Sequence, residues 1–209
     1  MNDLEALLKI YGIKEIFLPE NYHNKERILK AFQEKIKNCT KCELHKSRTK
    51  FVFGSGNPYA QIVIIGEAPG FEEDKKGEPF VGKAGKLLTS ILNEIGIDRN
   101  KDVFITNVVK CRPLNNRDPK EVEILTCKPY LDFQIKIISP KLIVALGRYS
   151  AGLLSSRPPE KALSNRGKII ESIYKIPLLI TYHPAAALRN PNLTPIIKSD
   201  LEKIREFLR

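Results

Sequence analysis

The sequence predicts a three-layer α/β/α fold in which helices cover both faces of a central four-stranded parallel sheet. Four short runs rich in Ile and Val recur along the chain, and each is almost continuously apolar, as strands buried on both faces are. They span residues 61–66, 103–109, 141–147 and 176–182. Helical patterns lie between the runs, and alternation of strand and helix is typical of parallel sheets. With 209 residues, 42% of them hydrophobic, the chain is long and apolar enough for one buried core.

Residues 1–37 predict an N-terminal helical extension. Apolar residues recur there at helical spacing in two groups, which Pro19 separates. The groups are Leu4, Leu7, Leu8 and Tyr11, and then Ile28, Leu29, Phe32 and Ile36. We therefore expect a single domain over 1–209, composed of this extension and of a catalytic core over 39–209.

Three helical patterns connect the predicted strands, over residues 84–95, 119–138 and 148–154. In parallel sheets of this kind, binding sites lie beyond the carboxyl ends of the strands. Glu67 follows the first strand in a turn rich in Gly and Pro, Asn107 lies at the end of the second strand, and His183 follows the fourth. Residue type alone supports two interpretations equally: a site built from three loops, or turn residues accompanied by one structural histidine.

The chain carries a formal net charge of +11, from 35 Lys and Arg against 24 Asp and Glu. A basic surplus of this size favours a polyanionic partner such as nucleic acid. No run reaches the roughly 18–20 apolar residues of a membrane span. The first residues are acidic rather than basic and no apolar segment follows them, unlike a signal peptide. We therefore expect a cytoplasmic protein without a membrane partner.

Four cysteines, Cys39, Cys42, Cys111 and Cys127, predict a metal site. The first two form a C-x2-C pair, and in a cytoplasmic chain such a pair favours metal binding over a disulfide. Two disulfides, or buried free thiols, remain alternatives. The spacing does not separate zinc from an iron–sulfur cluster, because both accept four thiolates.

Several sequence blocks resemble those of family 4 uracil-DNA glycosylases, the iron–sulfur type found in thermophilic bacteria and archaea. The blocks are GEAPG at 66–70, EPFVGKAG at 78–85, ITNVVKCRP at 105–113 and HPAAALRNP at 183–191, together with the four cysteine positions. They occur in the family's order over residues 39–191, and together they are highly specific. Abundant Ile, Lys and Glu with little Gln agree with a thermophilic source.

The resemblance implies the uracil-DNA glycosylase fold and a base-excision repair enzyme. Such an enzyme hydrolyses the N-glycosidic bond of deoxyuridine in DNA, after extruding the nucleotide into a pocket. The resemblance also implies a [4Fe–4S] cluster on the four cysteines, which would fasten the loops around the site. Phe80 would stack on the uracil, and Asn107 would read its O4 and N3–H groups.

Further roles follow from the same resemblance. His183 matches the catalytic histidine, which donates to uracil O2 as negative charge develops on the departing base. The backbone beside Ala68 would contact the base, and Glu73 would crowd the methyl group of thymine. In the best-known, cluster-free branch of the superfamily an aspartate stands where this chain has Ala68, so the usual general base is missing. Glu67 is the neighbouring candidate for orienting the attacking water.

Basic and apolar side chains near these blocks predict a DNA-binding face. Lys83 and Lys86 lie at a predicted helix start, where free amide groups also attract phosphate. Arg112 is expected at the rim of the same face. By resemblance, Leu188 fills the gap left by the flipped nucleotide and Arg189 lies near a phosphate.

Two other functions remain open from the sequence. One is a non-catalytic iron–sulfur protein that binds single-stranded DNA, and the other is a zinc-stabilised α/β hydrolase that acts on small nucleosides. The leading hypothesis is a monomeric hydrolase whose partner is uracil-containing DNA, single- or double-stranded. A sliding-clamp partner cannot be read from the sequence.

Overall fold

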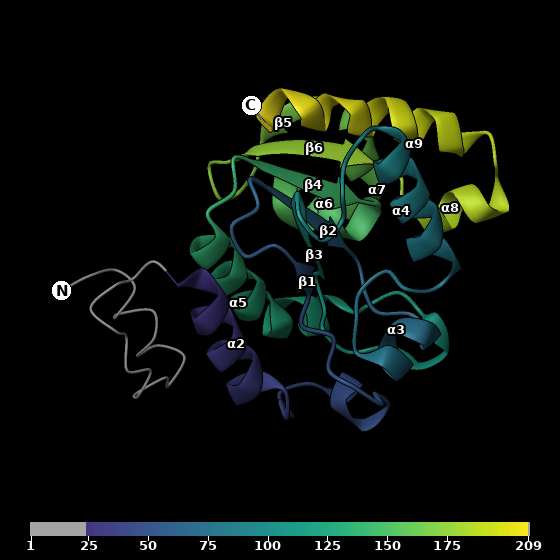
Figure 1. The fold of residues 1–209 in the computed structure, drawn as a ribbon. Coiled ribbons are helices and arrows are strands. Elements are labelled where there is room, and N and C mark those ends of the chain that lie inside the picture. Colours follow the sequence, from purple (N-terminus) through teal and green to yellow (C-terminus); the bar gives the residue numbers. More distant parts are fainter. Residues whose placement is uncertain (1–23, 209) are drawn as a thin grey trace.

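The structure, a computed structural model, describes residues 24–208 (Figure 1). Helix α2 (Lys25–Ile36) confirms the second half of the predicted N-terminal extension. Its buried residues are the predicted Ile28, Leu29, Phe32 and Ile36. Asn24 caps this helix, because its side-chain oxygen accepts a hydrogen bond from the Arg27 amide at 3.0 Å. The helical pattern predicted over residues 4–11 lies outside the described residues.

A mixed six-stranded sheet in the order β1-β3-β2-β4-β6-β5 forms the middle layer. Its four central strands are parallel and correspond to the four predicted runs. They are β2 (Ile62–Gly66), β3 (Val103–Asn107), β4 (Leu142–Leu146) and β6 (Pro177–Thr181). The predicted four-stranded sheet needs correction, because β1 (Ser55–Gly56) and β5 (Ile169–Glu171) add antiparallel edges. Both edge strands are short and incompletely buried, so neither carries the apolar run on which the prediction depended.

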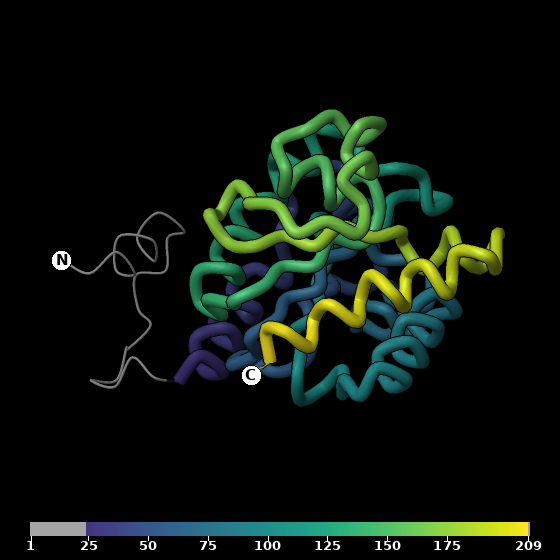
Figure 2. Tube along the Cα trace, turned by 90° about the horizontal axis from the view of Figure 1, so that it is seen from above, coloured from purple at the N-terminus to yellow at the C-terminus, as the bar shows by residue number. Residues whose placement is uncertain are grey.

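Helices cover both faces of the sheet, as predicted. Alternate residues of a strand point to opposite faces, so β2 contributes Val63 and Ile65 to one core and Ile62 and Ile64 to the other. Helices α2, α5 (Glu121–Ile138) and α6 (Arg148–Ser155) close the first core, and helices α4 (Lys83–Glu94) and α9 (Leu193–Glu202) close the second. In Figure 2 the yellow helix α9 lies beside the teal helix α4, on the same side of the sheet.

The remaining helices are short and connect these layers. They are α3 (Phe71–Lys76), α7 (Pro159–Ala162) and α8 (Pro184–Arg189). Short 3-10 helices lie at Glu43–Lys46, Leu114–Asn116, Leu163–Asn165 and Lys203–Phe207. No helix among residues 24–208 is both long and apolar enough to cross a membrane.

The carboxyl ends of the central strands bring distant segments of the chain together. Gly66 at the end of β2 pairs in register with Asn107 at the end of β3. On the other side of β2, Leu146 of β4 pairs with Thr181 of β6, two residues before His183. The turns that follow these four strands therefore meet at one edge of the sheet, which is where parallel sheets form their sites.

Candidate active site

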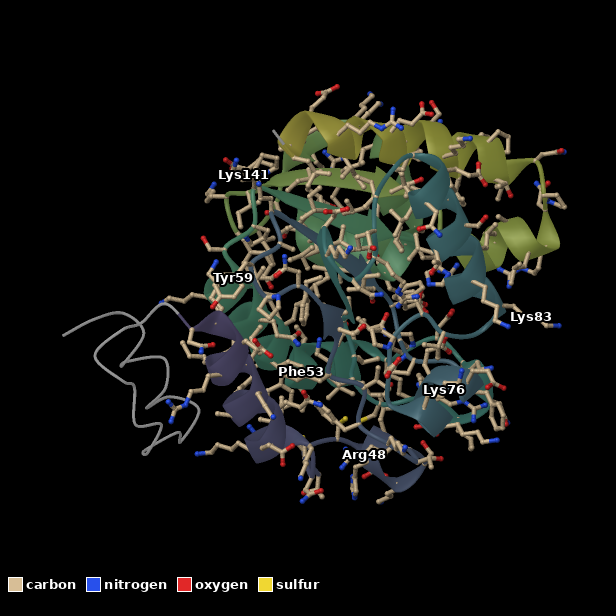
Figure 3. All side chains as sticks on the ribbon, viewed as in Figure 1. Arg48, Phe53, Tyr59, Lys76, Lys83 and Lys141 are labelled. Atoms are coloured by element: carbon tan, nitrogen blue, oxygen red, sulfur yellow. The ribbon has the colours of Figure 1, made fainter. Side chains whose placement is uncertain are left out.

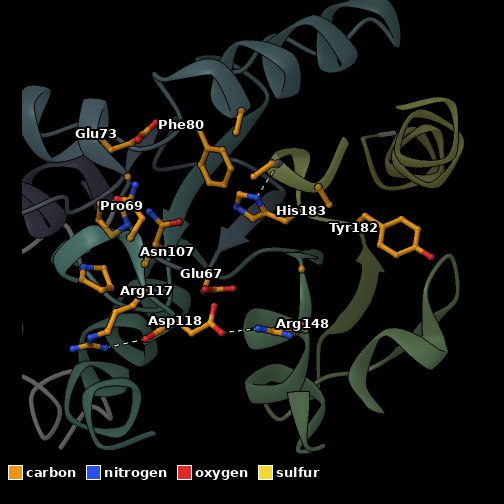
Figure 4. A pocket seen from close by; sticks show the side chains of 18 of the residues that line it. Glu67, Pro69, Glu73, Phe80, Asn107, Arg117, Asp118, Arg148, Tyr182 and His183 are labelled. Carbon is orange, nitrogen blue, oxygen red and sulfur yellow. Dashed lines mark hydrogen bonds and ion pairs between the residues drawn. The ribbon is translucent and has the colours of Figure 1, made fainter. Parts of the chain in front are cut away.

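A cavity of about 550 Å³ opens at the carboxyl edge of the sheet (Figure 4). The six residues predicted to bind or act on the base all line it: Glu67, Ala68, Glu73, Phe80, Asn107 and His183. They come from the turn after β2, from α3, from the segment before α4, from the end of β3 and from the start of α8. Five separate segments thus share one cavity, whose volume is that of a small-molecule site.

The amide of Asn107 presents an unpaired acceptor to this cavity. The residue is only 2% exposed, and its Oδ1 has no hydrogen-bond partner in the described structure. Because buried side-chain oxygens are nearly always paired, this atom is available to a ligand. Gly66 keeps the space open, since a Cβ at that position would lie 2.4 Å from this Oδ1 and 2.5 Å from Cζ of Phe80.

His183 stands opposite Phe80, with the two ring centroids 5.5 Å apart and the ring planes tilted by 31°. Its Nδ1 accepts a hydrogen bond from the amide of Ala185 at 3.1 Å, so the proton of the neutral ring is on Nε2. Although part of the residue faces the cavity, burial of the imidazole lowers the pKa of His183 to about 4, against the opposing charge of Glu73. At neutral pH the ring is therefore an uncharged donor through Nε2–H.

Glu67 lies beside an ion pair that the sequence analysis did not single out. Asp118 and Arg148 form the pair, with 2.6 Å between Oδ2 and Nη2, and Figure 4 shows both side chains close to that of Glu67. Burial, with a smaller contribution from the charge of Asp118, raises the pKa of Glu67 to about 7 despite the nearby Arg148. Arg148 is the second residue after β4, so its position at a strand end was a usable signal. Asp118 lies in the long connection before α5 and carried no such signal.

Glu73 is held by two backbone contacts. Its Oε1 accepts hydrogen bonds from the amides of Val81 and Gly82 at 2.9 and 2.7 Å. These bonds tie α3 to the start of α4 and fix the carboxylate at the cavity wall. The contact between Glu73 and a thymine methyl group stays a prediction, as does the contact made by the backbone of Ala68.

The predicted DNA-binding residues lie near the cavity in the sequence and in space. They are Lys83, Lys86, Arg112, Leu188 and Arg189, and each lines the cavity or lies within two residues of one that does. Leu188 is 48% exposed although it is apolar. The Nε of Arg112 donates to Asn116 Oδ1 at 2.7 Å, which orients the guanidinium along the rim.

The four cysteines border a second, smaller cavity beside α5. All four are free thiols, so no disulfide joins them. Nη1 of Arg48 lies 3.2 Å from Cys111 Sγ, the hydroxyl of Tyr130 lies 3.1 Å from Cys39 Sγ, and Figure 3 shows sulfur atoms close to Arg48. Among residues 24–208, no three His, Cys, Asp or Glu side chains converge on one position for a metal ion.

Lys110 connects the cysteine site to Asn107. Its side chain is fully buried, and its Nζ donates to Thr106 Oγ1 at 2.6 Å, to the Asn107 carbonyl at 2.7 Å and to Gln134 Oε1 at 2.7 Å. The next residue along the chain is Cys111. Nothing in the sequence singles out Lys110, because a lysine normally indicates the surface.

Comparison with known proteins identifies the family. A model of the uracil DNA glycosylase superfamily matches residues 53–209. The chain belongs to this superfamily. It is 54% identical over 186 residues to the type-4 uracil-DNA glycosylase of Sulfurisphaera tokodaii, covering 86% of this chain and 84% of that protein. The type-4 enzymes of Saccharolobus solfataricus and Thermotoga maritima are 48% and 43% identical, over 86% and 90% of this chain and 86% and 98% of those proteins.

These relatives confirm the resemblance to family 4, so the chain is a type-4 member of the uracil-DNA glycosylase superfamily. The sequence blocks that carried the resemblance are also the walls of the cavity. The block at 66–70 supplies four of its residues, and the blocks at 78–85, 105–113 and 183–191 supply the facing rings and the buried amide. The most specific parts of the sequence therefore coincide with the site.

Proposed function

We propose that this protein is a DNA-repair glycosylase that hydrolyses the N-glycosidic bond of deoxyuridine in DNA, releasing uracil and leaving an abasic site. The observation that carries the proposal is the unpaired, buried Oδ1 of Asn107 at the wall of the cavity. Type-4 relatives that match over most of their length support it.

Recognition of the base rests on the Asn107 amide. Its Oδ1 accepts the N3–H of uracil and its Nδ2 donates to O4, whereas cytosine presents an acceptor at N3 and a donor at C4. A buried amide that is left unpaired costs about 1–3 kcal/mol, which disfavours cytosine. The ring of Phe80 stacks on the base, and the backbone beside Ala68 completes the contact.

Cleavage of the bond between C1′ and N1 leaves the bonding electron pair on uracil. His183 stabilises this anion by donating its Nε2–H to uracil O2. A fixed donor of this kind acts as an oxyanion hole does, and it needs no charge of its own. The neutral state of the ring and the contact of Nδ1 with the Ala185 amide support this assignment.

Glu67 orients the attacking water. The water oxygen forms the new bond to C1′ of the sugar, and its proton passes to the ionised Glu67 carboxylate. The partial burial of Glu67 beside Asp118 keeps its pKa about 7, so the ionised form is a sufficient base near neutral pH. Weak activation is enough, because the oxocarbenium-like sugar is itself reactive.

Glu73 restricts the pocket to uracil. Its carboxylate crowds the position that the 5-methyl group of thymine would occupy. The two amide contacts from Val81 and Gly82 support this role, since they prevent the carboxylate from swinging aside.

The DNA lies across the rim of the cavity. Lys83, Lys86, Arg112 and Arg189 contact phosphates, and Leu188 fills the space that the flipped nucleotide leaves. The exposure of Leu188 and the net charge of +11 support this face. We also propose that the protein acts as a cytoplasmic monomer.

The cofactor is a [4Fe–4S] cluster held by the four cysteines, which when bound supplies a rigid cross-link through its iron–sulfur bonds. One feature supports the fit: the four thiols border one cavity, and four thiolates are the ligand set that such a cluster takes. Arg48 and Tyr130 each contact a sulfur atom, as polar groups around thiolate ligands do.

The experiment is the release of free uracil from an oligonucleotide with one deoxyuridine. Wild-type protein should release uracil, and Asn107→Asp should release much less, because a carboxylate cannot donate to O4. Binding of single-stranded DNA without any release would instead support the non-catalytic alternative. Release from free deoxyuridine but not from DNA would support a nucleoside hydrolase.

A further inference from the structure

The stacking residue Phe80 has an unfavourable backbone conformation. Its φ angle is 54°, in the left-handed region, although it is a bulky residue. Such a conformation is a genuine outlier for a large side chain, and it persists only where the surroundings enforce it. The residue is also only 5% exposed, so its ring is fixed in the wall of the cavity.

Arg99 holds this turn through a forked contact. Its Nη1 donates to the carbonyl of Phe80 at 2.7 Å, and its Nη2 donates to the carbonyl of Pro79 at 2.9 Å. Nη1 also donates to Thr89 Oγ1 at 2.9 Å, which anchors the guanidinium to α4. The planar fork of arginine is suited to two neighbouring acceptors, and the single ammonium of lysine is not.

The turn is confined from two further sides. A Cβ at position 85 would lie 2.0 Å from the carbonyl group of Phe80, so Gly85 lets α4 pack directly against the turn. Glu73 in addition binds the next two amides, those of Val81 and Gly82. Arg99 thus binds the two backbone carbonyls of this turn, and Glu73 binds the two backbone amides that follow them.

We infer that Arg99 is a positioning residue that keeps the Phe80 ring in place to stack on the base, an assignment that rests on the proposed function. Arg99 does not line the cavity, so it acts through the turn and not on the base. Without the fork, the backbone of Phe80 relaxes toward negative φ and the ring leaves its place opposite His183. The loss falls on base affinity, because stacking on an aromatic ring stabilises the bound base.

The test compares Arg99→Met and Arg99→Lys with a matched control, Arg205→Met. Arg205 also donates to a backbone carbonyl, from Nε to Ile95 at 2.8 Å, but at the far end of α4. We expect Arg99→Met to weaken the binding of free uracil by about tenfold. Arg99→Lys should retain part of the affinity, and Arg205→Met should bind as the wild type does.

A second measurement separates ring placement from general loss of structure. In a Phe80→Ala background, Arg99→Met should change uracil affinity by less than about twofold, because the ring through which it acts is gone. The NMR signals of the Phe80 ring, which lies near the imidazole of His183, should shift in Arg99→Met and not in Arg205→Met.

Three results would overturn the inference. They are unchanged uracil affinity in folded Arg99→Met, an equal loss with and without Phe80, and unshifted Phe80 ring signals. Wild-type protein that neither binds nor releases uracil would instead reject the proposed function, and the ring signals would still report whether Arg99 places Phe80.

Discussion

The amide of Ala185 gives His183 one tautomer and therefore one chemical role. Because Nδ1 is already bonded, the imidazole can only offer Nε2–H to the cavity. His183→Ala should lower the single-turnover rate of uracil excision by roughly 10²–10³-fold, the usual loss for one oxyanion donor. DNA affinity should change far less, since the donor acts on charge that is present mainly in the transition state. His183→Gln, which retains an N–H donor, should lose less, and a near-normal rate for His183→Ala would remove this residue from the mechanism.

We expect Glu67 to set the pH dependence of uracil excision. Its pKa is about 7 in the folded protein, so the excision rate should fall as pH decreases through about 7 and the carboxylate takes up a proton. His183, with a pKa of about 4, does not titrate in that range. Glu67→Gln should give a low rate without this pH dependence. Asp118→Asn should move the decline to lower pH, because the charge of Asp118 raises the pKa of Glu67.

The raised pKa of Glu67 also predicts that stability falls as pH rises, which is the opposite of the expected trend in activity. A carboxyl group with a raised pKa in the folded state binds its proton more tightly there than in the unfolded chain, so stability falls as pH rises toward 7. Glu67→Gln should therefore raise the melting temperature relative to wild type at pH 8 and change it little at pH 4. An equal shift at both pH values would show that Glu67 is not destabilised by burial.

Helix α8 carries the wedge of the proposed DNA contact. Pro184 and Ala187 are its buried residues, which leaves Leu188 pointing away from the core and 48% exposed. Leu188→Ala should slow excision most from a U·A duplex, less from a U·G mismatch and least from single strands, because the unstacking that a wedge offsets is largest in paired DNA. Single-turnover rates on the three substrates measure this.

Leu125→Ala is the matched control for the wedge. Leu125 is a similarly exposed leucine, at 56%, but it lies on α5 and does not line the cavity. Leu125→Ala should leave the excision rates on all three substrates unchanged. An equal loss on the three substrates in Leu188→Ala, with a lower melting temperature, would mean that Leu188 is a core residue.

Elements with continuous apolar runs could be predicted from sequence, and elements that depend on tertiary contact could not. The four central strands and α4, α5 and α6 were predicted because burial on one or both faces leaves a pattern in the chain. The edge strands β1 and β5 have no such pattern, since each pairs with only one neighbour and remains partly exposed. The sequence blocks located the cavity residues. Arg99 was not predicted, because the backbone carbonyls that it binds come near it only in the folded chain. Lys110 lies within the block at 105–113, but nothing in the sequence showed that its side chain is buried against the carbonyl of Asn107.

At the scale of the whole molecule, the cysteine site joins three parts of the chain that the sheet alone does not connect. Cys39 and Cys42 follow α2, Cys111 follows β3, and Cys127 lies within α5. Lys110 bonds the carbonyl of Asn107 and precedes Cys111, so the same linkage supports the strand end that carries Asn107, the proposed reader of the base. The proposed cluster would therefore act on the active site as a structural support.

This arrangement predicts that loss of one cysteine reduces stability before it reduces chemistry. Wild-type protein prepared without oxygen should contain four irons per chain, as the [4Fe–4S] assignment requires, and show broad visible absorption from thiolate-to-iron charge transfer. Cys111→Ala should lower the iron content and the melting temperature, while the excision rate per folded molecule stays close to wild type at low temperature.

Val109→Ala is the control, because Val109 is buried in the same segment and has no thiol. Val109→Ala should lower the melting temperature and keep the iron content and the visible absorption. Stoichiometric zinc in wild-type protein expressed with ample iron would contradict the proposed cluster.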